Sequence, residues 1–192
     1  MPKPSNIYVL RHGETEWSLS GQHTGRTDIP LTETGKKQAI ELGESLKNIR
    51  FSAVFVSPLG RARETAALAG LINATICDDL AEVNYGQYEG LTSTQIQERV
   101  PGWTVWTHPL PGGETLAQVA KRAKNVLDLA STYDGNVALV SHGHFSRIIA
   151  TVWLGFPPEA GKHLMLDTAC FSILSFEHDN PAIKLWNSQP HP

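Results

Sequence analysis

Two runs of apolar residues end in a histidine that is followed by glycine. The run at residues 7–10 leads into Arg11 and His12, and the run at residues 136–140 leads to His142. A neutral imidazole is nucleophilic near neutral pH without a separate base, and a guanidinium fits the oxygens of a phosphoryl group. The two histidines therefore indicate a site for phosphoryl chemistry, with His12 as the candidate nucleophile.

A further cation and an acid follow two other apolar runs. Arg61 comes shortly after the run at residues 52–56, and Glu82 follows a shorter one. Several cations around one point are costly unless an anion lies among them, and Gly143 allows backbone N–H groups to approach that anion. We expect the two arginines and His142 to hold the phosphoryl group. We expect Glu82 to protonate the leaving oxygen, provided that burial keeps it protonated.

Strands and helices must alternate to bring these groups together. The short apolar runs predict strands at residues 7–10, 52–56, 75–77, 136–140, 169–176 and 183–186, the last two as a hairpin. Helical spacing and capping residues predict helices at 33–47 after Thr32, 58–71 with Ser57 as cap and Pro58 at its first position, 92–99 with Thr92 and Gln95 as a capping box, 114–133, and 145–154. This order predicts an α/β fold, a three-layer α/β/α sandwich with a mostly parallel central sheet. Right-handed crossovers place the carboxyl ends of the parallel strands along one edge of that sheet.

The composition fits a single globular domain spanning residues 1–192. The chain is 41% hydrophobic, its formal net charge is -3 and its pI is about 6.2, which argues against a nucleic-acid or membrane-surface partner. The amino-terminal residues lack the apolar stretch of a signal peptide, and no later stretch is long enough for a membrane span. Cys77 and Cys170 are isolated and typical of reduced core thiols. We expect a cytoplasmic protein, and no pattern predicts its oligomeric state.

His142 and His144 stand at alternate positions, which raises the alternative of a metal pair. No carboxylate cluster accompanies them, and alternate residues that leave a strand need not face one site. We therefore expect no metal and no cofactor, and we interpret His144 as a supporting residue at a helix start.

Five strings in the sequence resemble the histidine phosphatase superfamily, also called phosphoglycerate-mutase-like. They are RHGETEW at 11–17, SPLGRARETA at 57–66, Glu82 with YGQYEG at 85–90, GGET at 112–115 and VSHGHFSR at 140–147. Their order is that of the family, and the resemblance covers nearly the whole chain. It implies a phosphohistidine at His12, a phosphate pocket of Arg11, Arg61 and His142, proton transfer by Glu82, and no metal.

A finer resemblance concerns the first loop and the end of the chain. RHGETEWSLSGQHTGRTDIPLT and HLMLDTACFSILSFEHDNPAIKLW are similar to the sedoheptulose-1,7-bisphosphatase group of sugar phosphatases. This similarity implies that Ser18, in place of the family's usual asparagine, contacts the phosphate. It also implies that Thr24 and Gly25 lie beside the substrate and that Tyr85 lies in the pocket wall.

The choice between a phosphatase and a mutase depends on cations around the pocket. Between residues 64 and 120 the only lysine or arginine is Arg99, and Asn84 replaces an arginine that the family has two residues after the acid. We expect a metal-independent phosphatase for a small phosphate monoester, a sugar phosphate or bisphosphate. The predicted outer wall consists of Tyr85, Trp103, Trp106 and His108. A second anionic group on the substrate stays open because His23 and Arg26 lie on the first loop. The alternatives are phosphoglycerate mutase-type transfer and a non-catalytic protein that binds a phosphorylated ligand.

Overall fold

The structure is a computed structural model and describes residues 4–190. Residues 1–3 and 191–192 lie outside the described residues. They are the two ends of the predicted domain, and residues 1–3 also begin the amino-terminal stretch that lacks the features of a signal peptide.

Six strands form one sheet in the described part of the chain. They are β1 (Pro4–Arg11), β2 (Phe51–Val56), β3 (Thr75–Ile76), β4 (Gly135–Ser141), β5 (Phe171–Glu177) and β6 (Asn180–Ser188). Their order across the sheet is β3-β2-β4-β1-β5-β6. The first four run parallel, whereas β5 pairs antiparallel with both β1 and β6. The mostly parallel sheet with a closing hairpin is confirmed.

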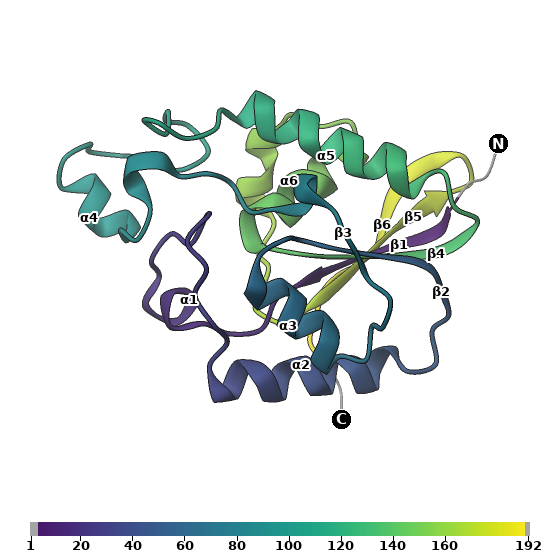
Figure 1. The fold of residues 1–192 in the computed structure, drawn as a ribbon. Helices are drawn as coiled ribbons and strands as arrows, with labels where there is room; N and C mark the ends of the chain where they lie inside the picture. The colour runs from purple at the N-terminus through teal and green to yellow at the C-terminus, as the bar shows by residue number, and fades with distance from the viewer. Residues whose placement is uncertain (1–3, 191–192) are drawn as a thin grey trace.

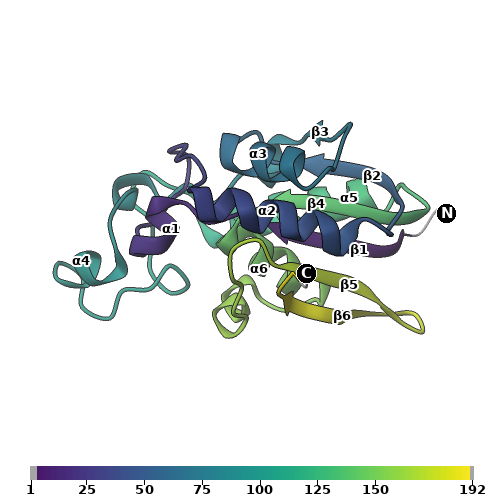
Figure 2. The ribbon, with the colours of Figure 1, turned by 90° about the horizontal axis from the view of Figure 1, so that it is seen from below.

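Helices cover both faces of this sheet. They are α1 (Glu16–Ser20), α2 (Glu33–Leu46), α3 (Gly60–Leu68), α4 (Ser93–Gln97), α5 (Leu116–Ala130) and α6 (Gly143–Trp153), with short 3-10 turns η1 (Asp78–Leu80), η2 (Gly86–Tyr88) and η3 (Pro158–His163). Figure 1 shows α5 and α6 on one side of the sheet and α2 and α3 on the other. Seen from the α2 side in Figure 2, β3 lies near one edge and the β5–β6 hairpin forms the opposite one.

The side chains of β1 alternate between two cores, as the pleat of a strand requires. Ile7 and Val9 pack with apolar residues of α5 and α6, whereas Tyr8 and Leu10 pack with residues of α2 and α3. All four are less than 10% exposed, so β1 lies in the middle of the three layers. The three-layer prediction is confirmed, and the strand that carries Arg11 and His12 is held from both sides.

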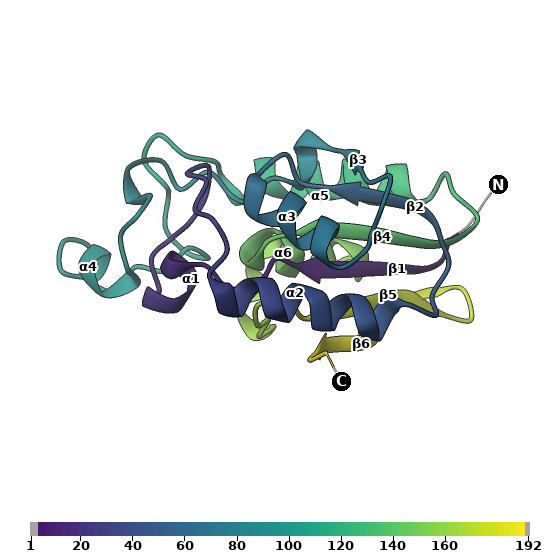
Figure 3. The ribbon, with the colours of Figure 1, turned by 60° about the horizontal axis from the view of Figure 1, so that its bottom comes forward.

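The segments that are neither sheet nor long helix gather beyond one end of the sheet. Figure 3 shows α1 and α4 there, beyond the end toward which β1 points. Two isolated bridges, Thr15 to Leu31 and Gln22 to Thr92, tie the first loop to itself and to the start of α4. The strand ends therefore open toward irregular chain from two distant parts of the sequence.

The structure corrects the predicted start of the helix after β2. Ser57 and Pro58 do not begin it, because α3 starts at Gly60 and its N-cap, Leu59, makes no side-chain capping bond. The Ser57 hydroxyl instead lies 2.7 Å from Nε2 of His142. A buried polar partner competes with the local capping role that the sequence suggests.

Other element boundaries also differ from the predictions. The first loop contains α1, whose capping box joins Thr15 and Ser18. The helix predicted at 114–133 is shorter, Leu116–Ala130, and the one predicted at 145–154 begins earlier, at Gly143. The capping box of Thr92 and Gln95 is confirmed.

Candidate active site

His12 follows the last residue of β1 and is held by the backbone on both sides. Its N–H donates to the Ser141 carbonyl at 3.0 Å, and its own carbonyl accepts from the Ala169 N–H at 2.9 Å. Nδ1 lies 2.7 Å from the Gly13 carbonyl. Because a carbonyl only accepts, Nδ1 must carry the proton and Nε2 keeps its lone pair. Burial, together with the Arg61 and Arg11 guanidinium groups, holds the pKa of His12 well below 6.5, so the imidazole is neutral.

Three buried nitrogen atoms beside His12 have no hydrogen-bond partner among the described residues. They are Nε of Arg11, Nε of Arg61 and Nδ1 of His142. The His12 and His142 rings are 5.1 Å apart at their centroids, and both arginines act on the pKa of His12. Buried donors are nearly always paired, so three such atoms around one imidazole indicate a place for an anion.

Arg61 is fixed by carbonyl groups of the first loop. Its Nη1 donates to Thr27 at 2.9 Å, and its Nη2 donates to Gly25 at 2.8 Å and to Thr24 at 3.1 Å. The side chain is 1% exposed, and Asp28 lies 3.5 Å from Nη1. Arg61 therefore places the first loop and leaves only its Nε without a partner in the described chain.

His142 is held by the Ser57 hydroxyl at its Nε2. The Ser57 oxygen also accepts from the Leu59 N–H at 3.3 Å, which leaves the hydroxyl proton free to donate to Nε2. With the hydroxyl donating to Nε2, the His142 proton lies on Nδ1, which is then a donor. Burial, then Arg61 and His12, hold the pKa of His142 well below 6.5.

Glu82 is 4% exposed, and its carboxylate accepts three backbone N–H groups. Oε1 accepts from Val83 and Phe145, both at 2.9 Å, and Oε2 accepts from His144 at 3.0 Å. A carboxylate offers about four lone-pair positions, so one position on Oε2 stays free. Glu82 lines the same cavity as His12, which makes that position the place where a proton can be exchanged with a ligand.

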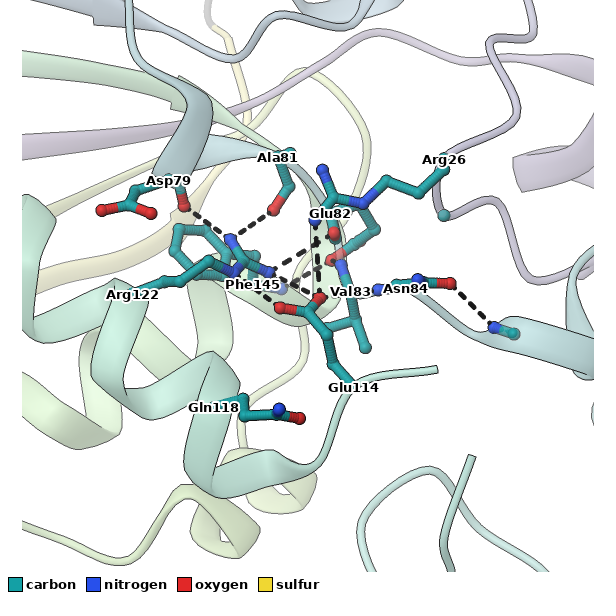
Figure 4. A network of polar contacts seen from close by, with 12 residues as sticks. Arg26, Asp79, Ala81, Glu82, Val83, Asn84, Glu114, Gln118, Arg122 and Phe145 are labelled. Carbon is teal, nitrogen blue, oxygen red and sulfur yellow. Dashed lines mark hydrogen bonds and ion pairs between the residues drawn. The ribbon is translucent and has the colours of Figure 1, made fainter. Parts of the chain in front are cut away.

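An ion pair between Arg122 of α5 and Glu114, just before that helix, holds the irregular segment that carries Glu82. Arg122 binds Glu114 through two nitrogens, at 2.8 and 2.9 Å. Its Nη1 also donates to the carbonyls of Asp79 and Ala81, and Glu114 accepts the Asn84 N–H at 2.8 Å. Figure 4 shows this pair under the turn on which Glu82 sits, with Arg26 approaching Glu114 from the first loop at 3.7 Å. The backbone before and after Glu82 is thus tied to one helix.

A cavity of about 180 Å³ opens over His12. Its lining residues are Arg11, His12, Trp17, Ser18, Gly21, Gln22, His23, Thr24, Glu82, Tyr85, Gly143, His144, Arg147 and Leu166. Seven of the ten predicted site residues are in this lining. Arg61, His142 and Gly25 are not: the first two are buried, and Gly25 donates its N–H to Glu89.

The two predicted contacts on the first loop line the cavity with their hydroxyls already engaged. The Ser18 oxygen accepts from the Thr15 N–H and donates to the Thr15 carbonyl, both at 2.9 Å. The Thr24 hydroxyl donates to the Gln22 carbonyl at 3.2 Å. A phosphate contact by either hydroxyl requires exchange of one of these bonds and stays a prediction.

The predicted outer wall is only partly right. Tyr85 lines the cavity, whereas Trp103 and Trp106 are 1% and 8% exposed and lie outside its lining. His108 belongs to a separate groove and bonds within its own turn. Apolar rings are more stable packed against each other than against a polar ligand, which explains why both tryptophans turned inward.

Neutral rings form the cavity wall, in which Tyr85 was predicted and His144 was not. The Tyr85 hydroxyl and Nδ1 of His144 are 2.5 Å apart, and His23 packs on Tyr85 at 4.9 Å between centroids. Burial raises the pKa of Tyr85 well above 10 and lowers the pKa of His23 to about 4. Burial also lowers the pKa of His144 well below 6.5, with Arg147 adding to the effect. These side chains bring polar atoms to the cavity without charge.

Arg147 is the charged cavity residue to which the sequence analysis assigned no role. It lies on α6 four residues after Gly143, and both line the cavity. Residues four apart share one face of a helix, so this spacing was the signal that could have placed it. Arg122 offered no comparable signal, because its partners at Asp79 and Ala81 are distant in sequence.

A family model for the histidine phosphatase superfamily (branch 1) matches residues 7–189. The chain belongs to this superfamily. The resemblance seen in its five strings is thereby confirmed, and with it the phosphoglycerate-mutase-like fold.

Three relatives of this histidine phosphatase, two sequences and one solved structure, carry phosphatase names. An acid phosphatase of Mycobacterium tuberculosis is 43% identical over 190 residues, covering 97% of this chain and 94% of that protein. Sedoheptulose 1,7-bisphosphatase of Saccharomyces cerevisiae is 32% identical over 180 residues, covering 77% and 66% of the two chains. The solved structure of a mycobacterial glucosyl-3-phosphoglycerate phosphatase in complex with VO3 has a TM-score of 0.86 at 28% identity, with 96% and 99% covered. The chain is a phosphoric monoester hydrolase.

Two kinds of feature are absent from the described residues of this histidine phosphatase. Across residues 4–190, no three His, Cys, Asp or Glu side chains gather in an arrangement that could hold a metal ion. Within the same range, no helix has the length and apolar character needed to span a membrane.

Proposed function

We propose that this histidine phosphatase hydrolyses small phosphate monoesters through a phosphohistidine on Nε2 of His12, without a metal ion. One observation carries the proposal. Three unpaired buried donors, on Arg11, Arg61 and His142, surround a neutral imidazole whose Nε2 lone pair is free. A phosphoryl group supplies the acceptors that these donors lack, and the imidazole supplies the nucleophile for it.

In the first step, Nε2 of His12 attacks phosphorus and the bond from phosphorus to the ester oxygen breaks. Arg11, Arg61 and His142 meet the charge on the three other phosphoryl oxygens. The free position on Oε2 of Glu82 holds the proton that goes to the leaving oxygen, so that oxygen leaves as a hydroxyl group and not as an alkoxide.

In the second step, the oxygen of a water molecule attacks phosphorus while the Glu82 carboxylate takes a proton from that water. The bond from phosphorus to Nε2 breaks, and inorganic phosphate leaves with the imidazole lone pair restored. The Gly13 carbonyl keeps the Nδ1 proton in place throughout, so His12 presents the same nitrogen in each cycle.

Hydrolysis is favoured over mutase-type transfer. A mutase must exclude water from its phosphohistidine, which calls for a longer covering insertion and additional cations. Asn84, where the family has an arginine, directs its side-chain oxygen to the Gly86 N–H and does not line the cavity. The segment beyond Glu82 therefore adds no charge to the pocket.

The substrate class we propose is a sugar phosphate or bisphosphate. We propose that the protein acts on it in the cytoplasm. Two of the relatives, sedoheptulose 1,7-bisphosphatase and glucosyl-3-phosphoglycerate phosphatase, are named for sugar-containing phosphate esters. The cavity wall of neutral polar rings, Tyr85, His23 and His144, suits the hydroxyl groups of such a molecule.

Hydrolysis of p-nitrophenyl phosphate in excess EDTA, by the wild type and by His12→Ala, tests the proposal. We expect turnover by the wild type and a loss of about 10⁴-fold or more in the variant. Equal residual rates would exclude His12 as nucleophile, and binding of phosphate without any turnover by the wild type would favour the non-catalytic alternative.

Nuclear magnetic resonance of 3-phosphoglycerate, with and without 2,3-bisphosphoglycerate, tests the mutase alternative. We expect free phosphate to accumulate. Rapid interconversion with 2-phosphoglycerate and no free phosphate would show that the chain is a mutase.

A further inference from the structure

The cavity holds two arginines that form no ion pair with a carboxylate of the described residues, Arg11 and Arg147. The other arginines with packed side chains have such a partner: Arg61 lies 3.5 Å from Asp28 and Arg122 lies 2.8 Å from Glu114. Arg11 belongs to the phosphoryl site proposed above. Arg147 has no part in that site, although burial lowers the pKa of its guanidinium.

The orientation of the Arg147 guanidinium is fixed before any ligand binds. Its Nε donates to the Gly161 carbonyl at 2.9 Å, and its Cζ lies 4.6 Å from the centroid of the Trp106 ring. Gly161 is itself packed on that ring, because a Cβ added to it would come within 2.7 Å of Trp106. With Nε and one face of the guanidinium engaged, only the two terminal nitrogens stay free for a ligand.

Those terminal nitrogens make no hydrogen bond within residues 4–190 and belong to a side chain that lines the cavity. A planar guanidinium with two free N–H edges matches the two oxygens of a carboxylate or of a phosphate. Its neighbours in the wall are uncharged rings, so no group there competes for it except the Glu82 carboxylate.

The position of Arg147 on α6 places it one helical turn from the phosphoryl site. Gly143 lies at the phosphoryl end, because a Cβ on it would come within 3.3 Å of the Arg11 guanidinium. Arg147 is one turn further on the same helix face, about 6 Å along the axis. Helical side chains also lean toward the N-terminus, in this case back toward Gly143. Two anionic groups separated by a few bonds can therefore occupy both sites at once.

We propose that Arg147 binds a second anionic group of the substrate, a carboxylate or a second phosphate, and so selects doubly anionic phosphate esters. This inference rests on the proposed function, since it assumes that the phosphoryl group to be transferred lies at His12. It makes Arg147 a residue that determines specificity and gives it no role in the transfer itself.

Matched substrates test this selection. 3-Phosphoglycerate and glycerol 3-phosphate differ by a carboxylate in place of a hydroxymethyl group, and fructose 1,6-bisphosphate and fructose 6-phosphate differ by one phosphate. We expect the wild type to have a kcat/KM about 10- to 100-fold higher for the doubly anionic member of at least one pair. In Arg147→Met, which keeps an apolar stem on Trp106, the preference falls to within about 3-fold, and kcat/KM for the singly anionic member stays within about 3-fold of wild type.

Arg63→Met is the control, because Arg63 is an exposed arginine of α3 outside the cavity and its loss changes the net charge equally. We expect it to keep the wild-type preference. Equal losses for both members of a pair in Arg147→Met, or a wild type without any preference, would overturn the proposal. An equal drop in preference in Arg63→Met would show an effect of net charge alone.

Binding separates this inference from the proposed function. Calorimetry on His12→Ala and on His12→Ala with Arg147→Met measures the affinity for the same esters without turnover. We expect the second change to weaken 3-phosphoglycerate about 10-fold or more and glycerol 3-phosphate by less than about 3-fold. That result would support the role of Arg147 even if turnover did not depend on His12, and equal weakening of both esters would contradict it.

Discussion

The two halves of the catalytic pair are positioned in different ways. His12 stands at the end of a central strand, where backbone hydrogen bonds to Ser141 and Ala169 hold it on both sides. Glu82 stands in irregular chain, where the Arg122 side chain of a distant helix holds the backbone and backbone N–H groups hold the carboxylate. The nucleophile depends on the sheet, and the acid depends on one ion pair.

This difference follows from what each group has to do. A nucleophile that attacks and departs along one line is best fixed in the rigid, close-packed layer between two cores. The acid must accept substrates of different shape beside it, which favours irregular chain that can vary without disturbing the sheet. The ion pair between Arg122 and Glu114 is 13% and 16% exposed, so it gives that chain a partly buried anchor.

Glu82→Gln should have the largest effect on the acid half and should reveal its dependence on the leaving group. We expect kcat/KM for glycerol 3-phosphate to fall about 10²- to 10⁴-fold, because an alkoxide needs a proton to leave. For p-nitrophenyl phosphate the loss should stay below about 10-fold, since the nitrophenolate leaves as a stable anion. Equal losses for both esters would remove Glu82 from the role of acid.

Arg122→Met should cause the same unequal loss of kcat/KM for the two esters as Glu82→Gln, but a smaller one. We expect kcat/KM for glycerol 3-phosphate to fall about 10- to 100-fold, with p-nitrophenyl phosphate within about 3-fold of wild type, because the change displaces Glu82 and leaves His12 in place. Kinetics with the two esters measure the difference.

Two further variants guard against a simple folding defect. Lys124→Met removes a charge from the same helix at an exposed pair with Asp128 and should leave both rates unchanged. In a Glu82→Gln background, Arg122→Met should add little further loss, because both act on one step. Full additivity of the two losses would show that Arg122 does not act through Glu82.

Thr65→Val tests the nucleophile half. The Thr65 hydroxyl accepts the Gly13 N–H at 3.0 Å and donates to the Arg61 carbonyl at 2.7 Å, so valine keeps the shape and leaves the Gly13 N–H unpaired. We expect a loss of about 1–3 kcal/mol in the free energy of unfolding. We also expect a fall of roughly 3- to 10-fold in kcat/KM, equal for alkyl and aryl esters. Thr65→Ser should restore most of the free energy of unfolding and most of kcat/KM. A loss of kcat/KM confined to alkyl esters would contradict the separate positioning of His12 and Glu82.

The smallest effect concerns the pH dependence of stability through His23. Its pKa is lowered from 6.5 to about 4 by burial, so below pH 6.5 the unfolded chain binds a proton that the folded chain does not. The free energy of unfolding should therefore fall by about 1.4 kcal/mol per pH unit from this group as the pH drops toward 4. Above pH 6.5 none of this stability should be lost. In His23→Gln one proton fewer should be taken up on unfolding, so the free energy of unfolding, measured in urea, should depend less steeply on pH. Identical slopes for the two proteins would contradict the burial of a neutral His23.

The nucleophile half was largely predictable from the sequence. Apolar runs before Arg11 and before His142 mark buried strands, and parallel strands bring their carboxyl ends together. The structure has β1 and β4 side by side, with Arg11 opposite Ser141. Local patterns were enough here because the positioning bonds belong to the sheet ladder itself.

The acid half and the cavity wall were not predictable in the same way. Glu114 appeared only as part of a family string, and nothing local links it to Asn84, whose N–H it accepts from 30 residues away. Ser57 was wrongly expected to cap a helix because its partner, His142, is 85 residues away. Side-chain bonds between distant segments leave no periodic trace, so such roles become visible only in the folded chain.

The most direct test of the central claim is to trap the phosphoryl enzyme. After a rapid acid-free quench with a radiolabelled phosphate ester, we expect a base-stable, acid-labile label that mass spectrometry places on His12. The label should be absent from His12→Ala and should build up in Glu82→Gln with p-nitrophenyl phosphate, because water then lacks its base. A label on serine or aspartate, or one that persists in His12→Ala, would contradict it.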